Sequence, residues 1–562
     1  MRVQRISALG ALDSPLIPLC GDSTWKPARI ATRTRAMTAP LFADDQLPSE
    51  VMAAITAAGP RQFASLHESD RGPLGIGKLR MVGVYDDRFE DTFMMRLRIP
   101  GGRLNADQLD AITDITDEFS VRSPGASERD RFSEISTRQN FQIHWIRFEH
   151  LAEIWQRLGA VGVGSVEACG NTMRNVTSCP VDGIDSEGVL DVAAVVAAVG
   201  ALIETDEPLT AFLPRKFKVA VTGCPTDCMI ARVNCVAFTP SQRGGRLGFG
   251  VHVGGGLSDY PRMATELDMF VEPSGVPVVV KAILELFCAE GDYEHSGVNR
   301  FRALVHQLGP DRVAAEIRAR VPSGTVEPRG EDLSTWEITD HLGVHPDRFG
   351  THYVGLSVPV GRLGVDDMRE MSRVARLHGD GNLRLTQRQN FVITGVGDVD
   401  ALLAEPLVAR FRPEPDPFER AVIACTSAPF CKFAILPMKT YGAALTSHLR
   451  ANVPEAGWDR LQGLRIHMSG CKASCAQIPL AHIGLRATMG KTDTDIFDAF
   501  DVAAGGDAGV GKLGRWACLE MPAPQVFDKI TSVLNDVAAG RMELDAIDVD
   551  TFDAALTASD SR

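Results

Sequence analysis

Four cysteines in the C-terminal half of the sequence form two close pairs with a spacing that suits metal binding. Cys425 and Cys431 lie in the segment ACTSAPFCK, and Cys471 and Cys475 follow in HMSGCKASC. Four thiolates are the usual ligands of a [4Fe–4S] cluster, whereas zinc sites favour pairs of the Cys-x2-Cys type. Free cysteines are also often simply buried. The spacing therefore predicts an iron–sulfur cluster, with zinc or four unligated thiols as the alternatives.

The elements that must position these cysteines belong to a chain that repeats itself. Segments of the first half return in the same order in the second half, and the matching pairs are 98–109 with 357–368, 136–146 with 386–396, 167–175 with 423–431, and 218–228 with 465–475. This period is far too long for a solenoid, whose repeats are a few tens of residues. We interpret the pattern as an internal duplication with a pseudo-twofold arrangement.

Each half is expected to be α+β and to consist of two parts. The first part alternates apolar and polar residues like strands at 93–101 and 135–146, around a helical pattern at 105–119. The second part mixes strand and helix patterns, and a segment at 320–335 rich in proline and glycine is expected to link the halves. The expected domains are 80–150 and 155–315 in the first half, and 340–410 and 415–545 in the second.

The composition excludes several classes of function. The chain has 562 residues, 44% of them hydrophobic, which allows two to four globular domains. A net charge of −14 argues against non-specific nucleic-acid binding, which needs a basic footprint. No apolar run approaches the roughly 20 residues of a membrane span, so a soluble body is expected. Twelve unevenly placed cysteines do not suit a disulfide scaffold.

The first 40 residues differ from the rest of the chain in their charge. The basic residues there are Arg2, Arg5, Lys26, Arg29, Arg33 and Arg35, against only Asp13 and Asp22 as acidic residues. We expect residues 1–45 to be an extension, either a disordered tail or the result of a start codon placed upstream of Met37. An arginine-rich, acid-poor segment is also typical of an organelle transit peptide. The expected location is therefore cytoplasmic, or organellar if the extension is a transit peptide.

Together, these motifs resemble the sirohaem-containing sulfite and nitrite reductases over residues 80–545. The shared features, in family order, are the Cys-x5-Cys and Cys-x3-Cys pairs, both RQN segments, MRN and LPRKFK. The resemblance implies that each half is a ferredoxin-like half-domain followed by a sirohaem- and cluster-binding α+β domain. It also implies one sirohaem and one [4Fe–4S] cluster, with Cys475 bridging the two. The chain departs from the family at Lys472 and Ala473, where Pro-Asn is usual, and at Ser427.

Positive charge is concentrated in the first half, whereas the cluster cysteines lie in the second. Across the repeat, Arg96 matches Gly355, Arg174 matches Phe430, Lys216 matches Gly463, and Lys218 matches Arg465. By resemblance, the substrate cage is formed by Arg96, Arg174, Lys216 and Lys218. By resemblance too, the macrocycle is contacted by Arg138, Gln142 and Arg215. Fixed cations raise the affinity for a small oxyanion and polarise its oxygens.

The resemblance implies a six-electron reduction of sulfite to sulfide or of nitrite to ammonia. The pair Lys216 and Lys218 favours sulfite, because a dianion gains more than a monoanion from a second ammonium. No Rossmann fingerprint is present, so the electron donor is expected to be external, and by resemblance it is ferredoxin. A monomer is expected. The alternatives are a precorrin-modifying enzyme, a non-redox zinc-binding protein, and a dissimilatory-type subunit that needs a partner chain.

Cysteines also recur in the first half. Cys169, Cys224 and Cys228 occupy positions that match cluster ligands in the repeat, with Asn175 at the fourth and Cys179 as a substitute ligand. They either hold a second cluster or are a relic of the duplication. We favour the relic, because a complete set of cluster ligands is normally four. By resemblance, Cys169 is alternatively expected to form a thioether with Tyr85.

Overall fold

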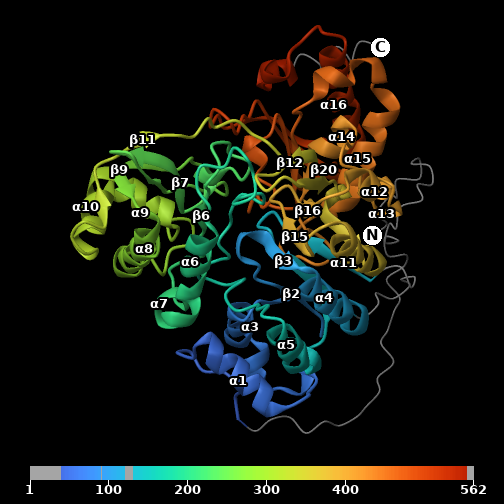
Figure 1. Ribbon diagram of the computed structural model, residues 1–562. Helices are drawn as coiled ribbons and strands as arrows, with labels where there is room; N and C mark the ends of the chain where they lie inside the picture. The colour runs from blue at the N-terminus through green and yellow to red at the C-terminus, as the bar shows by residue number, and fades with distance from the viewer. Residues whose placement is uncertain (1–38, 90, 121–130, 553–562) are drawn as a thin grey trace.

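The computed structural model describes residues 39–89, 91–120 and 131–552, and these form four β-sheets with helices packed around them (Figure 1). Most of the arginine-rich extension, including Met37, lies outside the described residues, so its role and the cellular location stay predictions. Residues 39–45 pack on the body of the protein. The backbone amides of Leu41 and Phe42 donate to the Asp70 carboxylate at 2.8 and 3.1 Å, and Phe42 is buried.

Two five-stranded antiparallel sheets form the ferredoxin-like parts of the two halves. The first has the order β1 (Val84–Asp86), β2 (Phe93–Arg96), β5 (Phe141–Ile146), β4 (Phe132–Ile135), β14 (Arg362–Gly364). The second has the order β12 (Gly343–Pro346), β13 (His352–Leu356), β16 (Phe391–Val396), β15 (Asn382–Leu385), β3 (Arg103–Asn105). The matching orders reflect the expected duplication.

The last strand of each of these sheets comes from the other half of the chain. β14 pairs with β4, with Arg362 opposite Glu134, and β3 pairs with β15, with Arg103 opposite Arg384. Arg362 also forms an ion pair with the fully buried Glu134 at 2.8 Å. The halves are therefore interlocked by a reciprocal exchange of strands.

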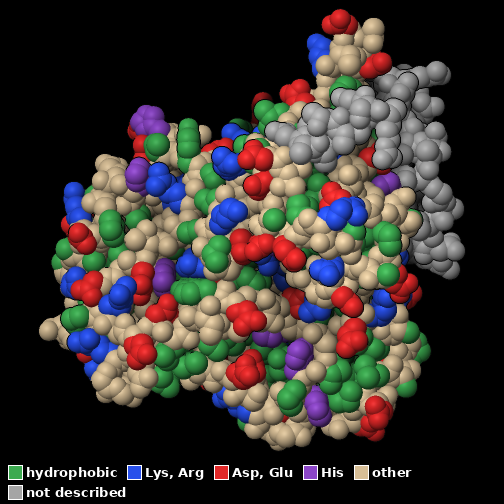
Figure 2. All heavy atoms as spheres, turned by 90° about the horizontal axis from the view of Figure 1, so that it is seen from above, with side chains coloured by type: hydrophobic (Ala, Val, Ile, Leu, Met, Phe, Trp, Pro, Cys, Tyr) green, Lys and Arg blue, Asp and Glu red, His purple; other side chains and the backbone are tan. Residues whose placement is uncertain are grey.

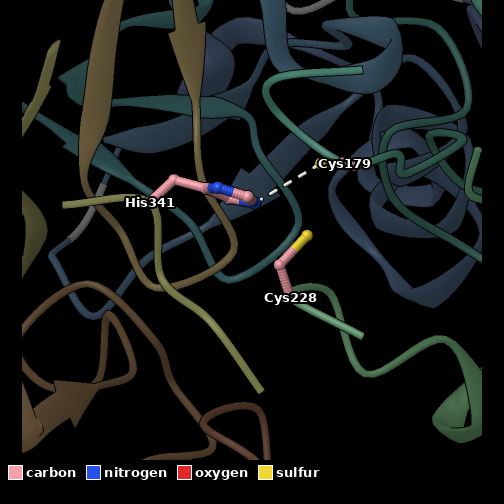
Figure 3. Close-up of side chains that lie close together, drawn as sticks. All are labelled: Cys179, Cys228 and His341. Atoms are coloured by element: carbon pink, nitrogen blue, oxygen red, sulfur yellow. Dashed lines mark hydrogen bonds between the residues drawn. The ribbon is translucent and has the colours of Figure 1, made fainter. Parts of the chain in front are cut away.

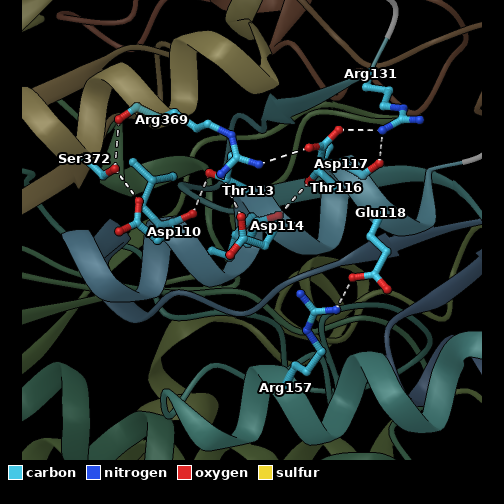
Figure 4. A network of polar contacts seen from close by, with 12 residues as sticks. Asp110, Thr113, Asp114, Thr116, Asp117, Glu118, Arg131, Arg157, Arg369 and Ser372 are labelled. Atoms are coloured by element: carbon cyan, nitrogen blue, oxygen red, sulfur yellow. Dashed lines mark hydrogen bonds and ion pairs between the residues drawn. The ribbon is translucent and has the colours of Figure 1, made fainter. Parts of the chain in front are cut away.

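A pair of equivalent helices, α4 (Ala106–Phe119) and α11 (Val365–His378), packs side by side on this interlocked core (Figure 1). Asn105 caps α4 by accepting the Gln108 amide at 2.9 Å. Arg369 of α11 reaches Asp114 and Asp117 of α4 at 2.8 and 3.0 Å (Figure 4). Exposed ion pairs of this kind contribute less than about 1 kcal/mol each, so the stability of the helix pair comes mainly from its buried apolar side chains.

Two larger sheets carry the remaining parts of the halves. The first-half sheet consists of β6 (Val219–Val221), β7 (Val236–Arg243), β8 (Arg246–Val253), β9 (Thr265–Val271), β10 (Val326–Glu327) and β11 (Glu331–Asp332). The second-half sheet consists of β17 (Val422–Ala424), β18 (Ile466–Ser469), β19 (Ile483–Lys491), β20 (Ile496–Ala504) and β21 (Arg515–Pro522). In both sheets a short parallel pairing leads into an antiparallel meander.

Helices complete both halves. The longer ones are α1 (Pro48–Ala58), α3 (Pro73–Met81), α5 (Leu151–Ala160), α6 (Ala193–Thr205), α8 (Val276–Glu290), α9 (Phe301–Leu308), α10 (Pro310–Arg320), α15 (Met438–Asn452) and α16 (Ala523–Ala538). The shorter ones are α2 (Glu68–Arg71), α7 (Glu207–Ala211), α12 (Val399–Leu403), α13 (Pro406–Arg410) and α14 (Pro417–Ala421). Among the helices that the structure describes, none is long and apolar enough to cross a membrane. Acidic and basic side chains are interspersed over the face shown in Figure 2.

The segment between the halves is fixed to the first half. β10 and β11 add to the first-half sheet. The residues that follow, 333–342, are called the linker strap below. Its backbone binds the loop after β6, where Thr335 donates to Pro225 at 2.8 Å and Glu337 accepts from Asp227 at 2.8 Å. The expected linker is therefore an integral part of the structure and covers the loop that holds Cys224 and Cys228.

Candidate active site and cysteine groups

The four second-half cysteines lie on two loops at one edge of a sheet. Cys425 follows β17, and Cys471 and Cys475 follow the parallel neighbour β18. Parallel strands bring their carboxyl ends to the same edge, so the loops meet. The Gly470 amide donates to the Cys425 sulfur at 3.2 Å. A Cβ at Gly470 would lie 2.3 Å from the Ser427 hydroxyl, so only glycine allows this approach.

The thiols of this group interact electrostatically, and three of the four residues, Cys425, Cys431 and Cys471, are half-buried. Burial, together with the charges of the other cysteines, raises the pKa of Cys471 to about 11 and raises that of Cys425 further. Without a metal the thiols of Cys425 and Cys471 are neutral at pH 7, and a bound metal displaces their protons. Four converging soft donors fit a [4Fe–4S] cluster.

Cys475 lies between this cysteine group and the first half of the chain. It is the exposed member of the group, and its carbonyl accepts the Thr137 hydroxyl at 2.8 Å. The charges of Arg96 and Lys216 both interact with its sulfur. Its place is the one that a ligand shared between a cluster and a neighbouring cofactor would need.

Arg96 comes from the end of β2 and lies where the first half meets the cysteine loop of the second half. The region around it is called the space between the halves below. Its Nε donates to Gln142 Oε1 at 2.9 Å, and its Nη1 lies 3.6 Å from the Cys169 sulfur. Its guanidinium also lies 5.8 Å from the centre of the Tyr85 ring. Gln142 in turn donates to the hydroxyl of Thr426, the residue after Cys425. Arg96, which is expected to bind the substrate, is therefore connected to the cysteine loop through the side chain of Gln142.

Arg174 is buried, Arg138 is half-buried, and both are held by neutral groups. Arg174 donates to the carbonyls of Ala168 and Gly170 at 2.8 and 2.7 Å. Arg138 donates to the Asn234 side chain at 2.8 Å and to the Asn175 carbonyl at 2.7 Å. The Nε of each guanidinium is buried without a partner. Both arginines therefore retain charge and donor capacity for an anion.

The cations around this space have no carboxylate within 4.0 Å in the described part of the chain. They are Arg96, Arg138, Arg174, Arg215, Lys216, Lys218 and Arg300. Burial and the charge of Arg174 lower the pKa of Lys216 to about 8, and burial and neighbouring cations lower that of Arg138 to about 9. Gathering buried cations without a counter-charge is costly, so the site fits a polyanion such as the carboxylates of sirohaem together with a small oxyanion.

The expected site residues differ in how deeply they enter this space. Arg96, Arg138, Gln142, Arg174, Lys216 and Lys218 come together there, on the side of Cys475. Arg215 is exposed at the edge and donates to Asn171 at 3.1 Å. Sequence reasoning missed Arg300, which is buried, contacts Ser258 at 3.4 Å and lowers the pKa of Lys216 and Lys218. No spacing in the sequence singles it out.

The strand pairing corrects one of the four repeat matches. Thr177 pairs with Ala220 of β6, and Ile423 pairs with His467 of β18. Ala220 and His467 match across the repeat, so Thr177 and Ile423 must match as well. This register makes Cys179, and not Cys169, the counterpart of Cys425. It also makes Arg420, and not Phe430, the counterpart of Arg174. The match of 167–175 with 423–431 was therefore wrong, because a local likeness in cysteine spacing hid the true register.

Comparison with known protein families identifies the chain. The model described as "Nitrite and sulphite reductase 4Fe-4S domain" matches residues 169–323, and the model described as "Nitrite/Sulfite reductase ferredoxin-like half domain" matches 86–161 and 345–409. The assimilatory ferredoxin-dependent nitrite reductase of Haloferax mediterranei is 34% identical over 507 residues, which cover 85% of this chain and 85% of that protein. The chain belongs to the nitrite and sulfite reductase family.

Two other members of the nitrite and sulfite reductase family also match this chain over most of its length. The ferredoxin–nitrite reductase of Leptolyngbya laminosa is 33% identical over 458 residues, covering 80% of this chain and 86% of that protein. The solved structure of Mycobacterium tuberculosis NirA superposes with a TM-score of 0.80 at 26% identity, covering 90% of this chain and 97% of that one. The expected family and the duplicated α+β fold are confirmed.

Family membership identifies the protein as an oxidoreductase that uses a sirohaem and one [4Fe–4S] cluster. The residues of the space between the halves fit these groups. The cysteine loops offer four thiolates, and the buried guanidinium nitrogen of Arg138 without a partner fits a carboxylate of a sirohaem. The alternative of a non-redox zinc-binding protein is thereby set aside.

Proposed function

We propose that the chain reduces nitrite to ammonia with reduced ferredoxin as its electron donor. Six electrons and eight protons convert nitrite to ammonium and two water molecules. Two observations support the proposal: the unpaired cations beside Cys475, and the names of the two relatives, which are ferredoxin-dependent nitrite reductases. The sequence-based preference for sulfite finds no support in those names. Sulfite becomes the second candidate, favoured by the spacing of Lys216 and Lys218.

The protein's own groups bind the anion and supply protons. Arg96 and Arg174 are fixed by hydrogen bonds to their surroundings, so their remaining donors need no rearrangement to meet an oxyanion. Lys216 holds a proton at Nζ that burial makes easier to release, which suits protonation of an oxygen that leaves as water. When bound, the sirohaem supplies electrons and an open iron position for the anion.

The bound cofactors would be held from both halves of one chain. Arg138, Arg215 and Arg300 face the place where the sirohaem carboxylates would lie, and Cys475 would be shared between cluster and sirohaem. Cys425, Cys431 and Cys471 would complete the cluster ligands. Because both halves of a single chain build this site, we propose that the enzyme works as a monomer.

The donor would dock where the cluster loop reaches the surface. Phe433 and Ile435, just after Cys431, are 57% and 42% exposed, although they are large and apolar. Lys432 and Lys472 lie on the two cysteine loops and are also exposed, where they form surface ion pairs with Asp86 and Asp259. An apolar patch flanked by lysines suits an acidic electron carrier and brings it close to the cluster.

Steady-state kinetics with reduced viologen and with reduced ferredoxin test the proposal. The expected result is a higher kcat/KM for nitrite than for sulfite with either donor. A higher value for sulfite would favour the second candidate. A protein loaded with both cofactors that reduces neither anion would refute both candidates.

A further inference from the structure

The first half of the chain contains a second group of soft metal ligands, far in sequence from the cluster cysteines. Cys179, Cys228 and His341 have ligand atoms that all lie within 4.8 Å of one another, and no other such His/Cys/Asp/Glu group occurs among the described residues. Figure 3 shows the three side chains turned toward one another from three separate segments. The Cys179 sulfur lies 3.4 Å from His341 Nε2.

A further thiol, that of Cys224, contacts one of these three. It interacts with the Cys179 thiol, and both residues are buried. All four residues are buried, and their surroundings include the apolar side chains of Val181, Ala220, Met229, Ala231, Ala237, Tyr353 and Val392. None of the cysteines is in a disulfide. These four residues, Cys179, Cys224, Cys228 and His341, are called the His341 site.

The internal duplication independently indicates that these positions bind a metal. In the corrected register, Cys179 matches Cys425, and Cys224 and Cys228 match Cys471 and Cys475 on the equivalent loops after β6 and β18. Three of the four cluster-ligand positions are thus kept as cysteine in the first half. The fourth ligand comes instead from the linker strap, as His341.

The backbone around His341 is shaped to bring the ring into this place. His341 has a φ of 58°, a left-handed value that is uncommon for residues other than glycine, although histidine adopts it more often than most. Its carbonyl would lie 1.8 Å from a Cβ at Gly355, so the strap can approach only because that residue is glycine. On either side of the ring, the strap is anchored by the ion pair of Asp340 with Arg420 and by the packing of the buried Leu342. Such strain persists when the surroundings hold it in place, and it often marks a functional position.

From this geometry we propose that the His341 site binds a single zinc ion and clamps the linker strap to the first half. Zinc–sulfur and zinc–nitrogen bonds of about 2.3 and 2.0–2.1 Å place two tetrahedral ligand atoms roughly 3.5 Å apart. The 3.4 Å between Cys179 and His341 matches that spacing. A [4Fe–4S] cube would spread its thiolates further apart than a single ion does.

The charge balance is consistent with such a site. Binding a divalent ion displaces the protons of three thiols to solvent, and the neutral imidazole keeps its other proton, so the loaded site carries one net negative charge. Arg384 interacts with Cys179, and its Nη1 is buried without a partner. Arg384 also interacts with Asp182 and Asp380, and it brings a positive charge close enough to Cys179 to interact with the loaded site. A closed set of four protein ligands leaves no open position, which is typical of structural zinc.

Metal analysis of the purified holoenzyme tests this inference, and the test does not depend on which anion is reduced. By inductively coupled plasma mass spectrometry, we expect about one zinc and about five irons per chain. X-ray absorption at the zinc edge should show three sulfurs at about 2.3 Å and one nitrogen at about 2.0–2.1 Å. Holoenzyme without zinc, or with about nine irons, would overturn the inference.

Variants assign the ion to these residues. Cys228→Ser should lose the zinc and keep the iron content and the visible absorbance, whereas the control Cys288→Ser, at a half-buried thiol elsewhere in the first half, should keep both metals. If Cys228→Ser does not fold, His341→Ala should still remove the nitrogen ligand from the zinc-edge spectrum. Zinc that keeps its three sulfurs and one nitrogen in both variants would contradict the assignment.

Discussion

The Asp340 carboxylate forms a bidentate ion pair with Arg420, 2.6 Å from Nε and 2.7 Å from Nη2. Arg420 is the counterpart of Arg174, whose guanidinium donates to two backbone carbonyls and contacts Tyr85 but forms no ion pair with a described carboxylate. The matching arginine thus has a carboxylate partner in the second half and none in the first half. The linker strap supplies the carboxylate that makes the difference.

This ion pair lies in a cavity that is the second-half equivalent of the active site. The cavity has a volume of about 270 Å³ and is lined by Asp340, Arg388, Arg420 and Arg465, among others. Arg388 and Arg465 match Arg138 and Lys218 across the repeat. One copy of the duplicated cation site thus contains its own anion, and the other remains open for a ligand.

Asp340→Asn should destabilise the protein and create a weak anion site. Arg420 and Arg388 hold the pKa of Asp340 below its usual range against the effect of burial, so the carboxylate is charged at pH 7. Its loss leaves Arg420 unpaired, at a cost of about 2–3 kcal/mol. Thermal unfolding should show this loss, and added sulfate should restore more stability to the variant than to the parent.

Asp366→Asn, at an exposed carboxylate of α11, is the matched control and should be neutral. A variant at Asp340 that unfolds like the parent, or that gains nothing from sulfate, would show that the cavity does not depend on this internal anion.

Cys475→Ser should reduce turnover with either anion by more than about 100-fold, because even residues that only support metal ligands cost up to that factor. The visible spectrum should change with it, since the proposed shared ligand is lost. Cys518→Ser, at a second-half thiol outside the cysteine loops, serves as the control. Parent-like absorbance and turnover in Cys475→Ser would contradict the bridging role.

Lys218→Asn should shift selectivity toward nitrite. Lys218 is surrounded by Arg138, Lys216 and Arg300, and a dianion gains more than a monoanion from this extra ammonium. The ratio of kcat/KM for nitrite to that for sulfite should rise by roughly 10-fold or more, as for loss of a charged hydrogen bond. The exposed Lys491→Asn should leave the ratio unchanged. An unchanged ratio in Lys218→Asn would remove this lysine from substrate recognition.

Glu167→Gln should flatten the dependence of stability on pH. Burial raises the pKa of Glu167 from its usual 4.5 to about 8, against the effect of a hydrogen bond from Thr210. Between these values the folded protein holds a proton that the unfolded chain has released, so this contribution to stability is full below about pH 4.5 and is lost as pH rises through 8.

The variant cannot lose this proton, so its stability relative to the parent should grow from pH 5 to pH 9, by up to about 4 kcal/mol. Denaturation midpoints measured across that range provide the test, with the exposed Glu153→Gln as the control. A difference between variant and parent that is the same at every pH would argue against a protonated Glu167.

The periodic patterns in the sequence predicted the regular elements well. The apolar period at 105–119 became α4, and the alternating segments became β2 and β5, because these patterns follow directly from burial of one face. The candidate cations could be predicted because the motifs around them are distinctive. Arg300 and His341 could not, because each is brought to its site by a segment whose own sequence carries no spacing signal.

The pairing of strands between the two halves could not be predicted from the sequence either. The strands β3 and β14 are three residues long, and nothing in their composition reveals that each joins the sheet of the other half. The same holds for the register that makes Cys179 the counterpart of Cys425. A comparison of short segments aligns them by residue identity alone. The register is instead fixed by hydrogen bonds between strands that are distant in sequence.

The exchanged strands also impose an order on biosynthesis. The first sheet has an open edge beside β4 until Arg362–Gly364 have left the ribosome, so the N-terminal half waits for more than half of the polypeptide to be translated. The anion site, which needs Thr137 against Cys475, closes later still. Neither half can therefore complete its own ferredoxin-like sheet, and the two halves of the anion site meet only after Cys475 has been translated.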